Sequence, residues 1–345
     1  MVILVANEPS NGDGHHEEYI ATLARLISNN GEAVRRSKFS TKLIFSRDTI
    51  FFMMFEDNPV QFVLSALVRG LLGRRTAGIL FLYAECIAPV TLRLRTKRAA
   101  LRFLRHFPGC AVVTIMPFTV EPQFEKIAKY GIYDFQWWDL AQSDIKSPAP
   151  SLPDDLISKI DSIAGSRKLV VALGTQNLEK GFDYFCKVWN ASGQSTLREK
   201  FLFVSGGRVV PETAEYAKDF EQSGGVLIDR SLSREELLAL YKRCDLVWCC
   251  YSPVHNRSSG IFGRSVQFGA PAAVRSGSYV AALADQIGHP VIALDWDRPE
   301  RAASQLVSYR AARREPEETQ RCVEDMKYYS LECLGAALGI TLRDQ

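Results

Sequence analysis

Short apolar strands alternate with amphipathic helices along most of this chain, and this alternation constrains the fold more than any other feature. In the first half, segment 2–5 has the composition of a buried strand, and apolar residues then recur at helical spacing until Asn30 and Gly31. Further strands are expected at 42–46, 78–83 and 111–116, and further helices at 60–72, 92–107 and 121–129. Such alternation predicts a parallel sheet with helices on both faces.

A cluster of three prolines at 148–153 interrupts the pattern and predicts an interdomain linker. The alternation then restarts, with strands expected at 168–173, 201–205, 226–228, 245–250, 272–274 and 291–294, and a long helix at 316–338. A length of 345 residues suits two domains. We therefore expect an α/β protein of two Rossmann-like, doubly wound domains facing across a cleft, residues 1–150 and 151–315. A C-terminal helix within 316–345 is expected to pack back on the first domain.

The composition excludes several classes of protein. Forty-two basic residues against 39 acidic ones give a formal charge of +3, too small for a nucleic-acid partner. The eight cysteines form no CxxC pair, which favours reduced thiols. The first residues lack the pattern of a signal peptide, and the longest apolar run, at 78–92, is short for a membrane span and contains Glu85. We expect a cytoplasmic protein.

Two glycine-containing turns follow strands of the second half. GTQNLEKGF (174–182) follows the strand at 168–173, and SSGIFGRSVQFGAP (258–271) follows the strand at 245–250. Parallel strands end at one edge of their sheet, where helix N-termini bind anions, so both turns are expected to meet one diphosphate. Lys180 is the main candidate for an ammonium group at that diphosphate. The alternative is a solvent-exposed lysine before a helix-starting glycine.

These turns resemble segments of a known family, in order along the chain. GTQNLEKGF, FVSGGR (203–208), GVLIDRSLSREELLALYKRCDLVWCCYSP (225–253) and SSGIFGRSVQFGAPAAV (258–274) resemble the GT-B glycosyltransferases, in particular retaining glycosyltransferase family 4. The amino-terminal ANEPSNGDGHH resembles the glycine-rich acceptor loop of that family. The resemblance implies a hexosyltransferase-type enzyme that binds a nucleotide sugar in the second domain and an acceptor in the first. It implies neither a cofactor nor a metal ion.

The resemblance also implies the roles of individual residues in the second domain. Lys180 and Arg264 are expected to stabilise the leaving diphosphate, and Arg264 can alternatively bind a charged sugar. Arg230 lies in the loop that meets the nucleotide base, and the alternative for it is an exposed loop charge. The chain departs from the family pattern at Asn256 and Arg264, where two glutamates are usual, and at Thr175, where an arginine is usual; Arg208 can replace that cation. The remaining substrate-binding candidates are Gly174, Ser258, Ser259 and Gly260.

Asp13, Gly14, His15 and His16 follow the first strand and are expected to bind the acceptor. An inverting transfer needs a general base, which His16 can supply, whereas a retaining transfer needs none. The resemblance favours retention, so acceptor contact is the first assignment for these histidines. The alternative is a solvated helix N-terminus with favourable acidic residues.

The segment TLRLRTKRAALRFLRHF (91–107) places Arg95, Arg98, Arg102 and Arg105 on one helical stripe beside leucines, and VRGLLGRR (68–75) is also basic. Such a helix suits anionic lipid and predicts peripheral contact with the inner membrane face and a lipid-linked acceptor. The alternative is an ordinary helix that buries its leucines and solvates its arginines. FFMMF (51–55) and QWWDL (136–140) are interpreted as core or interdomain packing.

The leading hypothesis is therefore sugar transfer in polysaccharide or glycolipid biosynthesis. A sugar-nucleotide 2-epimerase of the same fold is the second enzyme hypothesis, although it needs acid and base groups that the sequence offers only at 13–18. An inactive glycosyltransferase-like partner subunit is the third, because both expected glutamates are replaced.

Overall fold

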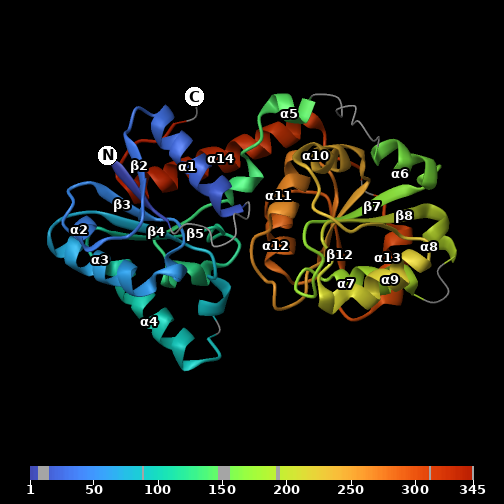
Figure 1. Cartoon of the computed structure of the whole chain (residues 1–345), viewed down its shortest axis with the longest axis horizontal. Helices are drawn as coiled ribbons and strands as arrows, with labels where there is room; N and C mark the ends of the chain where they lie inside the picture. The colour runs from blue at the N-terminus through green and yellow to red at the C-terminus, as the bar shows by residue number, and fades with distance from the viewer. Residues whose placement is uncertain (7–14, 88, 147–155, 192–194, 311, 344–345) are drawn as a thin grey trace. The chain divides into compact units, whose positions relative to one another are not determined.

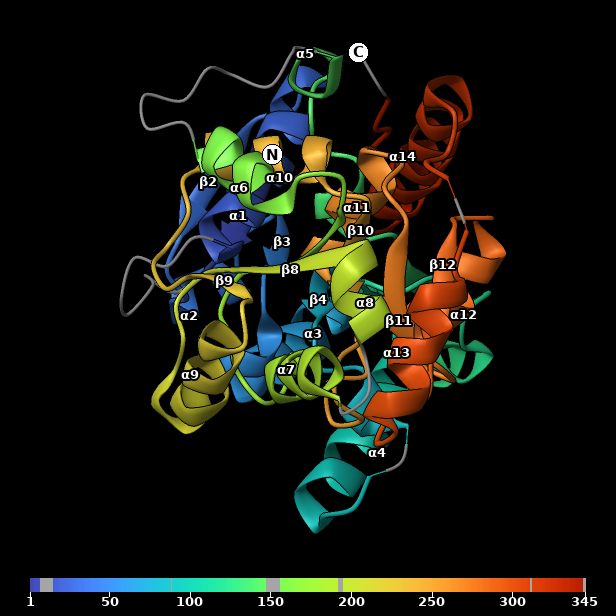
Figure 2. The same cartoon turned by 90° about the vertical axis from the view of Figure 1, so that its right-hand side faces the viewer.

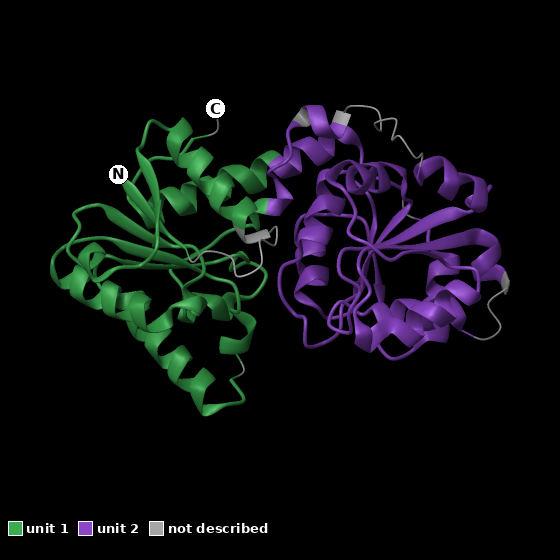
Figure 3. Cartoon of the chain, viewed as in Figure 1, with its two compact units in different colours: residues 1–135, 324–345 green, residues 136–323 purple. Residues whose placement is uncertain are grey.

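The computed structural model describes residues 1–6, 15–87, 89–146, 156–191, 195–310 and 312–343. These residues form two compact α/β units, each built around a six-stranded parallel sheet (Figures 1 and 3). Unit 1 comprises residues 1–135 and 324–345, and unit 2 comprises residues 136–323. The predicted α/β class with two doubly wound parallel sheets is confirmed.

The sheet of unit 1 has the strand order β2-β1-β3-β4-β5-β6. Every residue of β1 and β5 is buried, as expected for strands covered on both faces. The strands are β1 (Val2–Val5), β2 (Val34–Ser37), β3 (Thr49–Phe52), β4 (Thr76–Leu80), β5 (Cys110–Thr114) and β6 (Tyr130–Gly131). The helices are α1 (His15–Asn29), α2 (Thr41–Ile44), α3 (Pro59–Leu71), α4 (Leu92–His106) and, from unit 2 into unit 1, α14 (Pro316–Leu338).

The prediction of a strand at 42–46 is wrong. The chain forms the short helix α2 there, and the sheet strands are β2 and β3 on either side of it. The buried guanidinium of Arg69 donates hydrogen bonds to the carbonyl oxygens of Leu43 and Ser46, at 2.9 and 2.7 Å. A side chain thus satisfies carbonyl groups that a neighbouring strand would otherwise bind. The helix expected at 121–129 is also wrong, since only a short 3₁₀ turn forms at Pro122–Lys126 before β6.

The sheet of unit 2 has the strand order β12-β11-β10-β7-β8-β9. Its strands are β7 (Lys168–Leu173), β8 (Phe201–Gly206), β9 (Val226–Ile228), β10 (Leu246–Cys249), β11 (Ala272–Arg275) and β12 (Val291–Leu294). Its helices are α5 (Gln142–Lys146), α6 (Leu156–Ala164), α7 (Phe182–Asn190), α8 (Ser195–Lys200), α9 (Ala214–Gln222), α10 (Arg234–Arg243), α11 (Gly260–Gln267), α12 (Tyr279–Gln286) and α13 (Pro299–Ser308). Helix α7 contacts both α9 and α13, and these three lie together in Figures 1 and 2.

The units divide at 135/136 and 323/324 rather than at the expected linker. Segment 136–140 joins unit 2 because it bonds to the turn before α11 and to α11 itself: Trp137 Nε1 donates to the carbonyl of Ser259 at 3.0 Å, and Gln267 Oε1 accepts from the amide of Leu140 at 3.0 Å. The end of α14 belongs to unit 1, where the carbonyl of Leu338 accepts from Thr49 Oγ1 at 3.2 Å. No helix among the described residues is both long and apolar enough to cross a bilayer.

Candidate functional site

The order of strands in unit 2 identifies where a ligand crevice should lie. From β7 the chain proceeds outward to β8 and β9, and then returns to the other side of β7 to form β10. The loops that leave β7 and β10 therefore diverge from one point of the sheet edge. In open α/β sheets ligands bind at such a switch point, outside the carboxyl ends of the strands.

Glycines let the backbone loops of this edge approach one another. Gly174 ends β7 with a φ of +86°, and Gly207 follows β8 with a φ of +142°. A Cβ atom on Gly207 would lie 1.9 Å from the carbonyl oxygen of Gly174, so only glycine fits there. Thr175 and Arg208 come next in the two loops and are both exposed, with the amide of Gln176 bonded to the carbonyl of Arg208 at 2.9 Å.

Lys180 is held at this edge of the sheet by its own loop. Asn177 Oδ1 accepts a hydrogen bond from the amide of Lys180 at 2.9 Å, and Gly181 then turns the chain into α7 with a φ of +69°. A Cβ atom built on Gly174 would lie 3.1 Å from Lys180 Nζ and 3.7 Å from Ile261 Cδ1. The ammonium group therefore lies over Gly174 and near the first turn of α11.

The ammonium group of Lys180 has no hydrogen bond or ion pair with another side chain among the described residues. Burial lowers its pKa, and the positive charge of Arg257 lowers it further. A partly buried cation without a carboxylate partner is unfavourable unless an anion accompanies it. An anion beside Lys180 would favour its charged form.

The start of α11 is fixed by contacts within unit 2. Ser259 caps the helix, since its Oγ accepts from the amide of Phe262 at 3.2 Å and lies 2.6 Å from the hydroxyl of Tyr251. A Cβ atom on Gly260 would lie 1.9 Å from Gln136 Oε1. A side chain on residue 260 would therefore have to displace the amide group of Gln136, whether or not a ligand approaches it. Ser258 and Ser259 are both buried.

Arg264 lies one turn further along α11 and is paired with a carboxylate. Both of its terminal nitrogens bond Asp139, with Nη2 and Oδ2 separated by 2.9 Å. The two side chains are only 18% and 14% exposed. Asp139 thus neutralises the charge that the sequence assigned to a phosphate or sugar.

Arg230 and Asn256 have structural partners as well. Arg230 is exposed and forms two hydrogen bonds with the carboxylate of Glu236, at 2.6 and 2.8 Å, which raise its pKa. Glu236 also completes the capping box with Ser233 at the start of α10. Asn256 Oδ1 accepts from the amide of Tyr279 at 2.9 Å, at the first residue of α12.

The sequence analysis missed three residues beside Lys180. Glu179 Oε2 lies 3.2 Å from Arg257 Nη2 and 3.6 Å from His255 Nδ1, and the carbonyl of Glu179 accepts from the amide of Ser252 at 3.0 Å. Burial lowers the pKa of His255 to about 4, so this ring is neutral at pH 7. These contacts of Glu179 join the loop after β7 to the loop after β10. In the sequence, only the expectation that β7 and β10 are neighbours could have indicated these contacts.

The acceptor-side predictions lie outside the described residues. Asp13 and Gly14 belong to the undescribed segment 7–14, and the side chains of His15 and His16, at the start of α1, are not described either. Within the described part of the chain no group of three or more His, Cys, Asp or Glu residues could hold a metal ion.

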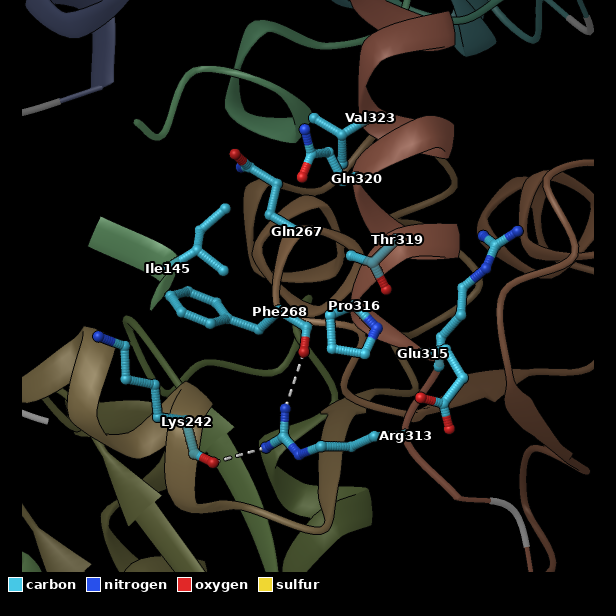
Figure 4. A pocket seen from close by; sticks show the side chains of 11 residues that line it. Ile145, Lys242, Gln267, Phe268, Arg313, Glu315, Pro316, Thr319, Gln320 and Val323 are labelled. Carbon is cyan, nitrogen blue, oxygen red and sulfur yellow. Dashed lines mark hydrogen bonds between the residues drawn. The ribbon is translucent and has the colours of Figure 1, made fainter. Parts of the chain in front are cut away.

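A pocket in unit 2 lies away from Lys180 (Figure 4). It is lined by the carboxyl-terminal ends of α10 and α11, including Lys242 and Phe268, and by the first turns of α14. Arg313 bonds the carbonyl oxygens of both residues at 2.9 Å. This pocket is at the opposite end of α11 from Lys180.

No protein-family model matches this sequence, and no curated protein matches it. Solved structures match over almost the whole chain. HepE from Anabaena in complex with UDP has a TM-score of 0.64 at 11% identity, covering 98% of this chain and 99% of that one. Sucrose-phosphate synthase from Thermosynechococcus elongatus has a TM-score of 0.61 at 10% identity, covering 98% and 97%.

WaaG, a glycosyltransferase involved in lipopolysaccharide biosynthesis, has a TM-score of 0.57 at 15% identity, covering 99% of this chain and 100% of that one. At such identities the likeness concerns the fold. This chain therefore has the two-sheet α/β architecture of the GT-B glycosyltransferases.

Proposed function

We propose that this protein is a hexosyltransferase-type glycosyltransferase that moves a sugar from a nucleotide sugar to a carbohydrate or lipid-linked acceptor. The observation that carries the proposal is the partly buried ammonium of Lys180, which lies 3.1 Å from the Cβ position of Gly174 at the switch point of unit 2. The fold adds support, because neighbours of the same architecture include HepE in complex with UDP.

In such a transfer the bond between the sugar and the diphosphate breaks, and the oxygen of an acceptor hydroxyl forms the new bond to the sugar. The proton of that hydroxyl passes to an oxygen of the leaving diphosphate. Negative charge then remains on the diphosphate. Lys180 and the backbone amides in the first turn of α11 can stabilise this charge. The positive charge comes from the chain itself, so the proposed step requires neither a cofactor nor a metal ion.

The finer assignments rest on the resemblance of the sequence. We assign the donor to the second domain and the acceptor to the first, with His15 and His16 in contact with the acceptor and retention of the anomeric configuration. The product belongs to polysaccharide or glycolipid assembly on the cytoplasmic side of a membrane, where segment 91–107 makes peripheral contact. WaaG, which is involved in lipopolysaccharide biosynthesis, offers a precedent on the same fold.

A nucleoside diphosphate titration tests the donor site. UDP, GDP and ADP are added to the protein, to Lys180→Ala and to Lys168→Ala, and melting temperatures are recorded. Lys168 is exposed at the other end of β7 and provides a matched control. One nucleotide should stabilise the wild-type protein and Lys168→Ala. Lys180→Ala should bind it at least about tenfold more weakly, a loss of about 1.4 kcal/mol, with a nearly unchanged melting temperature in its absence.

Equal stabilisation of Lys180→Ala and the wild-type protein would contradict the assignment of the site. Transfer of radiolabelled sugar from the matching nucleotide sugar to a membrane extract then tests catalysis, and Lys180→Ala should lose it.

An inactive, glycosyltransferase-like subunit is the second candidate function. It is favoured by the structural use of Asn256 and Arg264, which bond the start of α12 and Asp139 at positions where the resemblance implies glutamates. This candidate predicts that no nucleoside diphosphate stabilises the wild-type protein. The 2-epimerase hypothesis has no supporting observation among the described residues.

A further inference from the structure

Helix α3 in unit 1 has an uncovered apolar face. Its inner side buries Phe62, Ala66 and Gly70, whereas Val60 and Leu71 on its outer side are 74% and 81% exposed. At 100° per residue, positions 60, 64, 67 and 71 form one narrow stripe, all of them valine or leucine. Leu67 is half-buried, and the other three residues are exposed. An exposed apolar stripe of this kind indicates a surface that meets an apolar medium.

Helix α4 contacts α3 and adds positive charge. A Cβ atom on Gly70 of α3 would lie 2.4 Å from the carbonyl oxygen of Pro108, just beyond α4, so the two helices pack closely. On α4, Leu92 and Phe103 are 77% and 59% exposed, and the exposed arginines Arg93, Arg95 and Arg102 accompany them.

Two of the four arginines in the stripe expected from the sequence bond backbone carbonyl oxygens of unit 1. Arg98 Nη1 donates to the carbonyl of Ile87 at 2.9 Å, and Arg105 Nε donates to the carbonyl of Ala128 at 3.1 Å. Leu101 and Leu104 are buried in unit 1. These two leucines therefore serve the core, and most of the exposed apolar residues belong to α3.

The positive charge around α3 and α4 indicates which kind of partner can cover their exposed apolar residues. Glu85 is the single carboxylate side chain between Asn58 and Val120, a segment with eight arginines and one lysine: Arg69, Arg74, Arg75, Arg93, Arg95, Lys97, Arg98, Arg102 and Arg105. A second copy of the same face would bring like charges together, which opposes self-association. An anionic lipid surface offers both opposite charge and an apolar interior.

We infer that the outer faces of α3 and α4 form a docking surface for an anionic lipid bilayer. Val60, Leu64 and Leu71 enter the boundary between headgroups and acyl chains, and Arg93, Arg95 and Arg102 bind the phosphate groups. This inference rests on the membrane contact in the proposed function and names the residues that make it. It needs no nucleotide, so vesicle binding and nucleotide binding can fail separately.

Sedimentation of the full chain with lipid vesicles tests the inference. The protein should bind vesicles of phosphatidylglycerol and phosphatidylcholine, and bind pure phosphatidylcholine vesicles at least about tenfold more weakly. Leu64→Ser with Leu71→Ser should lower binding about tenfold, and Arg93→Gln with Arg95→Gln and Arg102→Gln should do the same. Raising the salt concentration should weaken binding of the wild-type protein.

Ile163→Ser with Lys218→Gln provides the matched control, since both residues are exposed on helices of unit 2. This variant should bind vesicles like the wild-type protein. No binding to anionic vesicles, equal binding to neutral vesicles, or unchanged binding of the α3 variant overturns the inference. So does a dimer in light scattering that Leu64→Ser with Leu71→Ser converts to a monomer, because the face would then belong to a second copy.

Discussion

Helices α3 and α7 cover sheets of similar architecture, but the surroundings of their outer faces differ. Both are rich in apolar residues, PVQFVLSALVRGL in α3 and FDYFCKVWN in α7, although Asp183, Lys187 and Asn190 give α7 one polar face. Helix α7 buries six of its residues because it lies against α9 and α13 as well as the sheet. The outer stripe of α3 stays exposed. Helices of similar apolar content thus form a core helix in unit 2 and an apolar surface in unit 1, and the difference lies in what packs outside the helix.

The largest expected effect is a loss of stability when a buried side chain of α7 is truncated. Phe185 is fully buried, with its ring 4.9 Å from that of Phe203 and 5.2 Å from that of Trp248. Phe185→Ala should lower the free energy of unfolding by about 3–5 kcal/mol, because it leaves a cavity among aromatic rings. Urea denaturation measures this loss. Lys187→Ala, on the exposed side of α7, removes an ion pair with Asp183 and should cost at most about 0.5 kcal/mol.

Unit 2 should also be acid-sensitive through His289, which is 4% exposed. Its Nε2 lies 3.0 Å from the carbonyl oxygen of Ala270, and burial lowers its pKa to about 4. The unfolded chain takes up a proton near pH 6.5, so stability is fully present above that pH and declines as the pH falls toward 4. The loss from this residue should reach about 3 kcal/mol.

His289→Gln should therefore flatten the decline in unfolding free energy between pH 7 and pH 4.5, whatever the substitution costs at pH 7. The neutral ring of His255, with its pKa also lowered to about 4, contributes in the same direction and leaves part of the slope. An unchanged slope in His289→Gln would show that the native state accepts the proton near pH 6.5 after all.

Gly31 in unit 1 and Gly181 in unit 2 have similar backbone angles but differ in the space around their Cβ positions. Gly31 ends α1 in unit 1 with a φ of +77°, and nothing lies within 4 Å of its Cβ position. Gly181 in unit 2 has a φ of +69°, and a Cβ atom there would lie 2.4 Å from the carbonyl oxygen of Cys250. Gly31→Ala should cost about 1 kcal/mol, from backbone strain alone.

Gly181→Ala should cost about 2 kcal/mol or more, and it should weaken nucleotide binding because it displaces the loop that carries Lys180. Thermal denaturation with and without the stabilising nucleotide measures both effects. Similar costs for the two substitutions would mean that the loops after β7 and β10 move apart easily.

Local patterns predicted the fold well, and contacts distant in sequence account for most of the differences. The loop at 174–181 was identified because Lys180 and Gly181 follow a strand directly. Glu179 and Arg257 were not, since only the pairing of β7 with β10 brings them together. Local sequence also does not predict the ion pair between Arg264 and Asp139. The same holds for the hydrogen bonds from Arg69 to segment 42–46, which forms a helix instead of the expected strand.

The smallest expected effect completes the comparison of the two helices. Leu71→Ser on the outer face of α3 should change the free energy of unfolding by no more than about 0.5 kcal/mol, because Leu71 is 81% exposed in the folded protein. Phe62→Ala on the inner face of the same helix, where the ring stacks on Phe55 at 4.2 Å, should cost several times more. Urea denaturation of both variants separates the faces. If Leu71→Ser cost as much as Phe62→Ala, the stripe would be covered in solution, and α3 would be a core helix like α7.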